Sequence, residues 1–240
     1  MNLALALLVG LVAAPQGPGY ANPTTVKVKI PMVGKVAANV GLVQFATSAP
    51  LCDFAEQTVR DSELHLARLW VRESKEMMRE VLQDRPKMEQ YLSYEGDTAL
   101  KYDSKQLLSV WAHAEYYSGG AHGMRNTRTY NFALAAGKPV RFGVKEAFLR
   151  DKASRVALQS LLVQRAGMLE GTMWIAEGQV KYLSDEQLDR FWVDQDALVW
   201  EFDPYELGPY SSGPYTLSIP RMDVQTHIRP DGPLGFWARQ

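Results

Sequence analysis

Four carboxylates are the side chains of this sequence best suited to chemistry. Glu115 lies in a segment whose side chains alternate in character, Glu201 and Asp203 lie in a second such segment, and Glu206 follows three residues later. Enzymes that hydrolyse glycosidic bonds use two carboxyl groups about 5–10 Å apart. Acidic side chains are also common on the solvent face of a strand. The pattern therefore leaves two interpretations open, a catalytic carboxylate pair and an ordinary wet strand face.

A glycine-rich loop at residues 119–126 carries His122 and Arg125, two side chains that can contact a ligand. A histidine in such a loop can also hydrogen-bond the backbone of its own turn or act as a general base. All three roles stay open for His122. Glycine tolerates the positive φ angles of tight turns, and five glycines are expected to serve turns in this chain: Gly119, Gly120, Gly123, Gly137 and Gly213.

A second loop, residues 204–214, contains three prolines and carries Tyr205, Glu206 and Tyr210. Proline restricts the backbone, so such a loop loses less entropy when it binds a partner. Tyrosine is a frequent anchor at binding surfaces, although Tyr205 and Tyr210 could equally pack against the end of a sheet. We expect the two loops, with the wet strand face described above, to form one contact surface.

Several function classes lack support in the sequence. It contains no Gly-x-Ser-x-Gly element, no P-loop and no cluster of Cys and His, so serine hydrolase, nucleotide and zinc chemistry are not indicated and no cofactor is expected. His65 has no His or Cys three or four residues further on, so no metal site is expected there. A net charge of −1 gives no electrostatic basis for binding nucleic acid. The single cysteine, Cys52, is expected to be buried and inert.

Alternating side chains predict the strands that would carry these loops. Period-two alternation indicates strands at residues 24–33, 110–117, 127–134, 198–203 and 215–219, with a short further strand around Val140 and Phe142. Residues 36–51 fit either a strand or a helix. A linker is expected at residues 95–98, and the tail beyond Asp223 is expected to be loosely held.

Apolar spacing and capping residues indicate the helices. Asp53 with Glu56 resembles a capping box for a helix of about 30 residues, which would lie across the whole sheet. Asp151 is expected to cap a second helix, and Ser184 with Gln187 a short third one. The predicted fold class is therefore α+β: a mostly antiparallel sheet with one long helix and a second helix packed on it.

The N-terminal residues have the character of a secretory signal peptide. Residues 3–14 are uncharged and apolar, and they are too few to span a bilayer, which takes about 20 residues. Small residues at Gly19 and Ala21 fit a cleavage site, so the mature chain is expected to begin at or near Asn22; a retained apolar anchor is the alternative. We expect a signal peptide at 1–21 and a single α+β extracytoplasmic domain, periplasmic or secreted, at 22–240, with an N-terminal part (24–142) and a C-terminal part (143–223).

Three segments resemble a known family. They are residues 116–122 (YYSGGAH), residues 130–132 (YNF) with Gly137-Lys138, and residues 202–210 (FDPYELGPY) with Gly213. In this order they resemble the extracytoplasmic domain of the lysozyme-sensing anti-sigma factors, which also occurs beside peptidoglycan deacetylase domains and alone in exported bacterial proteins of unknown function. The resemblance covers most of residues 24–222. It implies an α+β domain that binds lysozyme as a protein ligand.

The departures from this family limit what carries over. The sequence shows no cytoplasmic sigma-binding segment, no second transmembrane candidate and no deacetylase domain, so only the binding domain is expected. The predicted function is a non-catalytic, exported cell-envelope domain that recognises a lysozyme-type cell-wall enzyme or a peptidoglycan fragment. No nucleic-acid partner and no membrane span in the mature chain are expected. The alternatives are an enzyme that acts on cell-wall polysaccharide through paired carboxylates, and an assembly or structural role.

Overall fold

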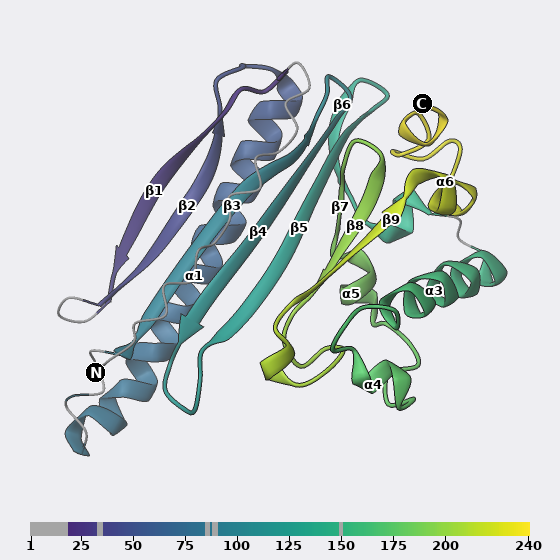
Figure 1. Ribbon diagram of the computed structural model, residues 1–240. Coiled ribbons are helices and arrows are strands. Elements are labelled where there is room, and N and C mark those ends of the chain that lie inside the picture. The colour runs from purple at the N-terminus through teal and green to yellow at the C-terminus, as the bar shows by residue number, and fades with distance from the viewer. Residues whose placement is uncertain (1–18, 33–35, 85–86, 88–90, 149–150) are drawn as a thin grey trace, which may run out of the picture.

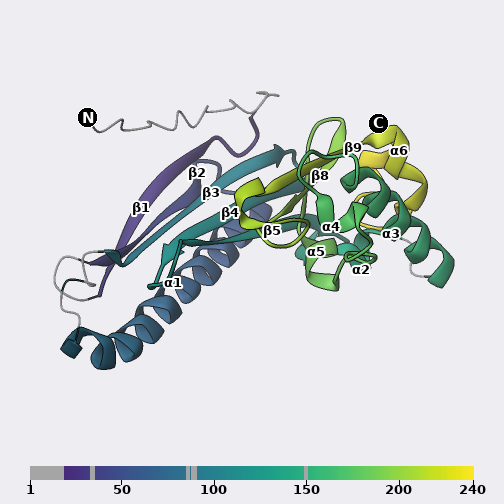
Figure 2. The ribbon, with the colours of Figure 1, turned by 60° about the horizontal axis from the view of Figure 1, so that its bottom comes forward.

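A six-stranded sheet with one long helix forms the larger part of the molecule. The computed structural model describes residues 19–32, 36–84, 87, 91–148 and 151–240. Helix α1 (Pro50–Asp84) covers one face of the sheet, and a three-stranded sheet with short helices lies beside it (Figure 1). Seen from a second direction, the small sheet lies on the side of the large sheet opposite α1 (Figure 2). This arrangement confirms the predicted α+β class with a mostly antiparallel sheet. The predicted signal segment falls largely on residues 1–18, outside the described residues.

The large sheet is antiparallel except at one pair of neighbours. Its strands lie side by side in chain order: β1 (Pro23–Pro31), β2 (Ala37–Phe45), β3 (Ser93–Asp103), β4 (Leu107–Tyr117), β5 (Met124–Ala135) and β6 (Lys138–Phe142). Strands β2 and β3 pair in parallel. A parallel pair needs a long crossover connection, and α1 supplies it here.

Alternation along β4 and β5 separates the two faces of the large sheet, as the sequence predicts. Val110 is buried toward α1, and the Tyr130 hydroxyl donates to the Ser62 hydroxyl of α1 at 2.8 Å. Trp111 and Thr127 point the other way and hydrogen-bond Glu201 of the small sheet and Asp203 just after it. The sheet is therefore the middle layer between α1 and the small sheet.

Helix α1 is longer than predicted, with 35 residues, and begins at Pro50. It packs an apolar stripe that includes Trp70 against the sheet. The prediction that Asp53 caps the helix is wrong, because Asp53 lies inside the first turn. The Glu56 carboxylate instead accepts a hydrogen bond from the Phe45 backbone N–H at 2.9 Å. Glu56 thereby ties the start of the helix to the end of β2.

Residues 95–98, expected to be a linker, lie within β3. Glu95 pairs with Asn39 of β2 on one side and with Glu115 of β4 on the other. The Asn39 side chain also donates to the Glu95 carboxylate at 2.7 Å. The polar residues suggested a linker, but this part of the strand exposes one face to solvent, where no apolar side chain is required. The ambiguous residues 36–51 form β2 and the start of α1.

The small sheet and the short helices form the rest of the molecule. The sheet has the order β7 (Phe191–Val193), β8 (Ala197–Phe202) and β9 (Tyr215–Pro220), all antiparallel. The helices are α2 (Val144–Ala147), α3 (Lys152–Ala166), α4 (Met173–Ala176), α5 (Asp185–Asp189) and α6 (Arg221–Val224). The predicted caps at Asp151 and Ser184 are confirmed, since each side chain accepts a backbone N–H of its helix. Strand β7 has three residues, too few to give a periodic signal.

One large core joins the small sheet to α3 and to the C-terminal tail. Trp200 of β8 and Leu162 of α3 are fully buried in this cluster. Leu234 and Trp237 of the tail are buried in it as well, and the Trp237 indole donates to the Asp194 carbonyl at 3.1 Å. The prediction of a loosely held tail is therefore wrong, because a turn-rich segment can still supply core residues. Among the described residues, no helix combines the length and apolarity that crossing a bilayer requires.

The glycine-rich turn between β4 and β5 needs positive φ at two positions. Gly119 has φ 105° and Gly120 has φ 116°, whereas Gly123 is not among the positive-φ residues of the described chain. The other two predicted turn glycines are also confirmed, with φ 78° at Gly137 and 75° at Gly213. A β-branched side chain is strongly disfavoured in this region of φ.

Replacing Gly120 with valine is expected to lower the free energy of unfolding by about 1–3 kcal/mol through backbone strain. A Cβ atom at Gly120 would have no neighbour within 4 Å, so crowding does not contribute. Urea denaturation measures the loss, and Ala121→Val, at an exposed position of the same turn, is the matched control. Equal midpoints for the two variants would contradict this account of the turn.

Candidate functional site

The tips of the β4–β5 and β8–β9 hairpins meet at one end of the molecule (Figure 1). The His122 ring stacks on the Tyr210 ring, with 3.8 Å between the ring centroids and 20° between the ring planes. His122 Nε2 also lies 2.9 Å from the Tyr205 hydroxyl oxygen. The structure therefore brings together His122, Tyr205 and Tyr210, which the sequence places on two separate loops.

A fourth aromatic ring, from α4, completes this group. Trp174 stacks on Tyr205, with centroids 6.4 Å apart and planes 20° apart. The Trp174 backbone N–H donates to the Leu207 carbonyl at 3.3 Å, which holds α4 against the second loop. We call these four rings the tip cluster: His122, Trp174, Tyr205 and Tyr210. Sequence reasoning missed Trp174 because residues 168–183 carry no periodic pattern. The signal that could have found it is the tryptophan itself, which stands in a segment that does not have the pattern of a core element.

Tyr205 is held in an unfavourable backbone conformation. Its φ of 73° lies in the left-handed region, which costs a non-glycine residue about 1–2 kcal/mol. Its side chain is nevertheless 45% exposed. Strained residues persist where the surrounding structure determines their conformation, and they concentrate at binding and active sites. The strain at Tyr205 therefore marks this tip as a candidate binding site.

Glu206 holds the strained loop in place. Its carboxylate accepts the Asp203 backbone N–H at 2.7 Å and faces Arg190 Nη1 at 2.7 Å. Burial raises the pKa of Glu206, against the opposing effect of Arg190 and of the hydrogen bond from Asp203. The structure places Glu206 beneath the tip cluster, where it supports the loop that carries Tyr205.

The contacts of His122 define its tautomer. Nδ1 lies 2.8 Å from the Gly123 carbonyl oxygen, which can only accept a hydrogen bond, so Nδ1 carries the proton. In the neutral ring, Nε2 then accepts from the Tyr205 hydroxyl. His122 thus bonds the backbone of its own turn, one of the roles that the sequence leaves open, and also joins the two loops.

Behind the tip cluster, two acids of the β8 segment fasten the small sheet to the large one. Trp111 Nε1 donates to the Glu201 carboxylate at 2.9 Å, and Arg125 pairs with the same carboxylate. Thr127 donates to Asp203 from its backbone N–H at 2.8 Å and from its hydroxyl at 2.7 Å. We call these five residues the sheet junction: Trp111, Arg125, Thr127, Glu201 and Asp203.

The expectation that Glu201 lies on a wet strand face is wrong. Glu201 is only 5% exposed, because the polar side of β8 faces β5 of the other sheet rather than solvent. Glu115 is exposed, and its carboxylate lies 3.6 Å from Arg125 Nη1. Arg125, predicted to contact a ligand, therefore links an exposed acid to a buried one.

All four candidate carboxylates are paired with arginine. Arg125 contacts Glu115, Glu201 and Asp203, and Arg190 contacts Asp203 at 3.2 Å and Glu206 at 2.7 Å. Buried carboxylates need such donors to offset the loss of water. Because protein donors occupy the buried acids, the arrangement favours a structural role over acid–base catalysis for this network.

His113 lies beside the sheet junction in an unusual environment. Its ring packs on Trp111 with 4.5 Å between centroids, and its buried Nδ1 has no hydrogen-bond partner among the described residues. Burial, and then the positive charges of Arg125 and Arg128, lower the pKa of His113 to about 4. The neutral ring is therefore the form that the folded protein holds.

The unfolding free energy is expected to fall as pH drops from about 6.5 to about 4, because His113 then takes up a proton in the unfolded chain but not in the folded one. The variant His113→Phe should lose this part of the pH dependence, while His65→Gln, at an exposed helix position, should keep it. Urea denaturation at several pH values measures both. An unchanged pH profile in His113→Phe would contradict the assignment.

The described residues contain no group of three or more His, Cys, Asp or Glu side chains arranged to hold a metal ion.

Comparison with known proteins shows which family profile and which solved structures this chain resembles. Residues 168–222 match the sequence profile of the family described as "Protein of unknown function (DUF3298)". A DUF3298 family member from Bacteroides fragilis NCTC 9343 has the same fold, with a TM-score of 0.56, 17% identity and coverage of 93% of this chain and 99% of that one. A DUF3298 family protein from Pseudomonas aeruginosa PAO1 has a TM-score of 0.57, 15% identity and coverage of 90% and 96%. No curated protein matches the chain. The matched segment 168–222 includes three rings of the tip cluster and both junction acids.

Proposed function

We propose that this chain, which has the fold of the DUF3298 family proteins, is an exported, non-catalytic cell-envelope protein that binds a lysozyme-type cell-wall enzyme. The observation that carries the proposal is the tip cluster, in which four aromatic rings from three separate segments gather at one end of the molecule. Aromatic side chains are the commonest anchors of protein interfaces. Their convergence on exposed loops supports binding as the function of this end.

Contacts within the chain hold the tip in one conformation without a partner. Pro209 leads into a short 3-10 helix at Tyr210–Ser212, and Gly213 closes it with a positive φ. The Tyr205–His122 hydrogen bond and the stacking of His122 on Tyr210 join this loop to the neighbouring hairpin. A preordered surface loses little entropy on docking, so the geometry suits recognition of a rigid partner.

The choice of partner rests on the sequence resemblance. Residues 202–210, which resemble the lysozyme-sensing domains, carry both Tyr205 and Tyr210 of the tip cluster. The open cleft of a lysozyme suits a projecting, stiff loop. A cell-wall glycan is the second candidate, because Tyr205 is 45% exposed and offers an aromatic ring to which a sugar could bind.

Calorimetric titration of the protein with a purified lysozyme tests the proposal. The variants Tyr210→Ala and His122→Ala should each weaken binding by at least tenfold, roughly the loss seen at interface anchors. Tyr91→Ala removes an exposed tyrosine outside the tip cluster and is the matched control, expected to bind like the wild type. Near-UV circular dichroism checks that each variant is folded.

Two results would change the assignment. Folded tip variants that bind lysozyme as tightly as the wild type would remove the tip cluster from the interface. A wild type that binds no lysozyme but binds soluble peptidoglycan fragments, with loss in Tyr210→Ala, would move the ligand to the glycan.

Export is part of the proposal, with a mature chain that begins at or near Asn22. The residues just before this point make contacts with the fold. Ala21 is fully buried and its N–H donates to the Asp103 carboxylate at 2.9 Å. The Thr47 hydroxyl donates to the Tyr20 carbonyl at 2.6 Å. Cleavage directly after Ala21 would remove both interactions, whereas a site a few residues earlier would keep them.

N-terminal sequencing of protein recovered from the envelope or the medium locates the processing site. The free energy of unfolding is expected to be about 1–3 kcal/mol lower for a chain that starts at Asn22 than for one that starts at Gly19. The shorter chain lacks the buried alanine and its hydrogen bond to a carboxylate. Urea denaturation of the two purified chains measures the difference. An intact Met1 on exported protein would contradict cleavage.

A further inference from the structure

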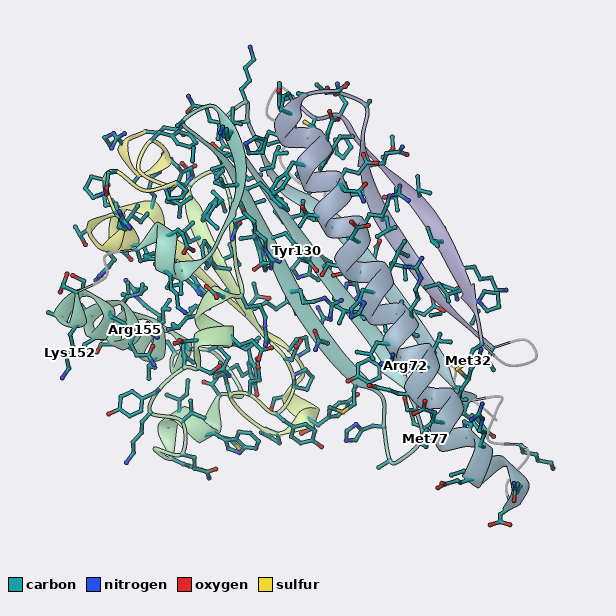
Figure 3. All side chains as sticks on the ribbon, turned by 180° about the vertical axis from the view of Figure 1, so that it is seen from behind. Met32, Arg72, Met77, Tyr130, Lys152 and Arg155 are labelled. Atoms are coloured by element: carbon teal, nitrogen blue, oxygen red, sulfur yellow. The ribbon has the colours of Figure 1, made fainter. Side chains whose placement is uncertain are left out.

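A groove runs along the outer side of α3, on a surface that shares no residue with the tip cluster. It has a volume of about 600 Å³. It is lined by Lys152, Arg155, Val156, Gln159, Ser160, Val163 and Gln164 of α3, and by Lys181, Tyr182 and Leu183 of the segment before α5. The α3 residues recur every three or four positions and so form one complete stripe of the helix. Figure 3 shows Lys152 and Arg155 on α3, at the end of the molecule away from α1.

The groove has an apolar surface that no part of the described chain covers. Tyr182 is 78% exposed, the highest value among the large apolar residues that the structure describes, and Val156 is 56% exposed. The opposite side of α3 is already occupied, because Leu158 and Leu162 are buried in the core. Neighbouring exposed apolar side chains on a folded surface commonly mark an interaction site.

The charged residues that line the groove have one sign. Three of the described residues that line it are cations and none is an acid. Arg155 pairs with Asp185, which lies outside the groove. In the described part of the chain, neither Lys152 nor Lys181 has an ion pair. The surface is therefore complementary to a partner that presents apolar side chains flanked by acids.

The walls of the groove are held at a defined separation. The Gln159 side chain donates to the Leu183 carbonyl at 3.0 Å, which fastens α3 to the opposite wall. Leu183 is itself 5% exposed and packs in the core. The lined stripe extends from Lys152 to Gln164, about 18 Å at 1.5 Å per residue. That length accommodates about three turns of a second helix.

We propose that this groove docks an acidic amphipathic helix of a partner protein. Its apolar side would lie against Val156, Val163 and Tyr182, and its carboxylates would pair with Lys152 and Lys181. Small Ser160, near the middle of the stripe, lets the backbone of the incoming helix approach closely. This is the helix-in-groove mode of recognition, read out by anchors at helical spacing.

A bilayer surface fits the groove less well than a helix does. Gln159, Ser160 and Gln164 lie along the stripe between the apolar side chains. Burying such polar groups in lipid without hydrogen-bond partners is costly, whereas the side chains of a partner helix can satisfy them. The concave shape also favours an inserted segment over a flat surface.

NMR titration of the full-length protein with a stapled helical peptide tests the proposal. The peptide has about three turns, leucine at helical spacing and glutamate on both flanks. Amide shifts are expected at residues 152–164 and 181–183. The double variant Lys152→Glu with Lys181→Glu should weaken binding by at least tenfold. The matched control reverses two exposed lysines of β1, Lys27→Glu with Lys29→Glu, and should bind within about twofold of the wild type.

The outcomes separate the possible occupants. A peptide with lysine in place of glutamate that binds equally well, or shifts confined to other surfaces, would overturn the proposal. Binding to vesicles of anionic phospholipid that is lost in the Lys152/Lys181 double variant, without peptide binding, would assign the groove to a membrane and overturn it too. Binding of the acidic peptide that weakens with added salt and with charge reversal supports it.

Discussion

The rest of the structure depends on the burial of two carboxylates between the sheets. Glu201 and Asp203 are buried against β4 and β5, where the Trp111 indole N–H, the Arg125 guanidinium and the two donors of Thr127 bind them. Taking a charged group out of water is costly unless its lone pairs are satisfied. Any slippage of the small sheet over the large one would leave these acids without partners. The junction therefore defines one position of the two sheets.

The tip cluster follows from that position. The chain leaves β8 at Phe202 and enters the loop that carries Tyr205 directly after the junction acid Asp203. The same acid is held by Arg190, which also holds Glu206 beneath the loop. The β4–β5 turn is positioned by Thr127, the junction residue on β5, which lies five residues beyond His122. Both halves of the tip are thus positioned by one buried network rather than by the loops themselves.

The two surfaces described here use different physical means of recognition. The tip cluster gathers aromatic rings that pack on one another, and a hydrogen bond joins His122 to Tyr205, so it offers a rigid shape. The groove along α3 exposes Val156 and Tyr182 and is lined by Lys152 and Lys181, which have no ion pair among the residues that the structure describes, so it offers apolar contact and charge. The groove and three of the four tip rings lie in the half of the molecule built around the small sheet, whereas His122 comes from the β4–β5 turn of the large sheet. The large sheet and α1 act as the platform against which this half is ordered.

The sequence by itself determined what depends on neighbouring residues alone: the alternation along β4 and β5, the caps at Asp151 and Ser184, and a positive φ within the glycine-rich turn. These follow from local sterics, helix ends and period, which a short segment contains in full. Tertiary structure decided which polar residues are inside. Glu201 has the local pattern of a solvent-exposed acid, and Trp174 lies in a segment without any pattern. Their roles arise only when strands and loops far apart in the chain meet, because burial is a property of the partner surface and not of the residue.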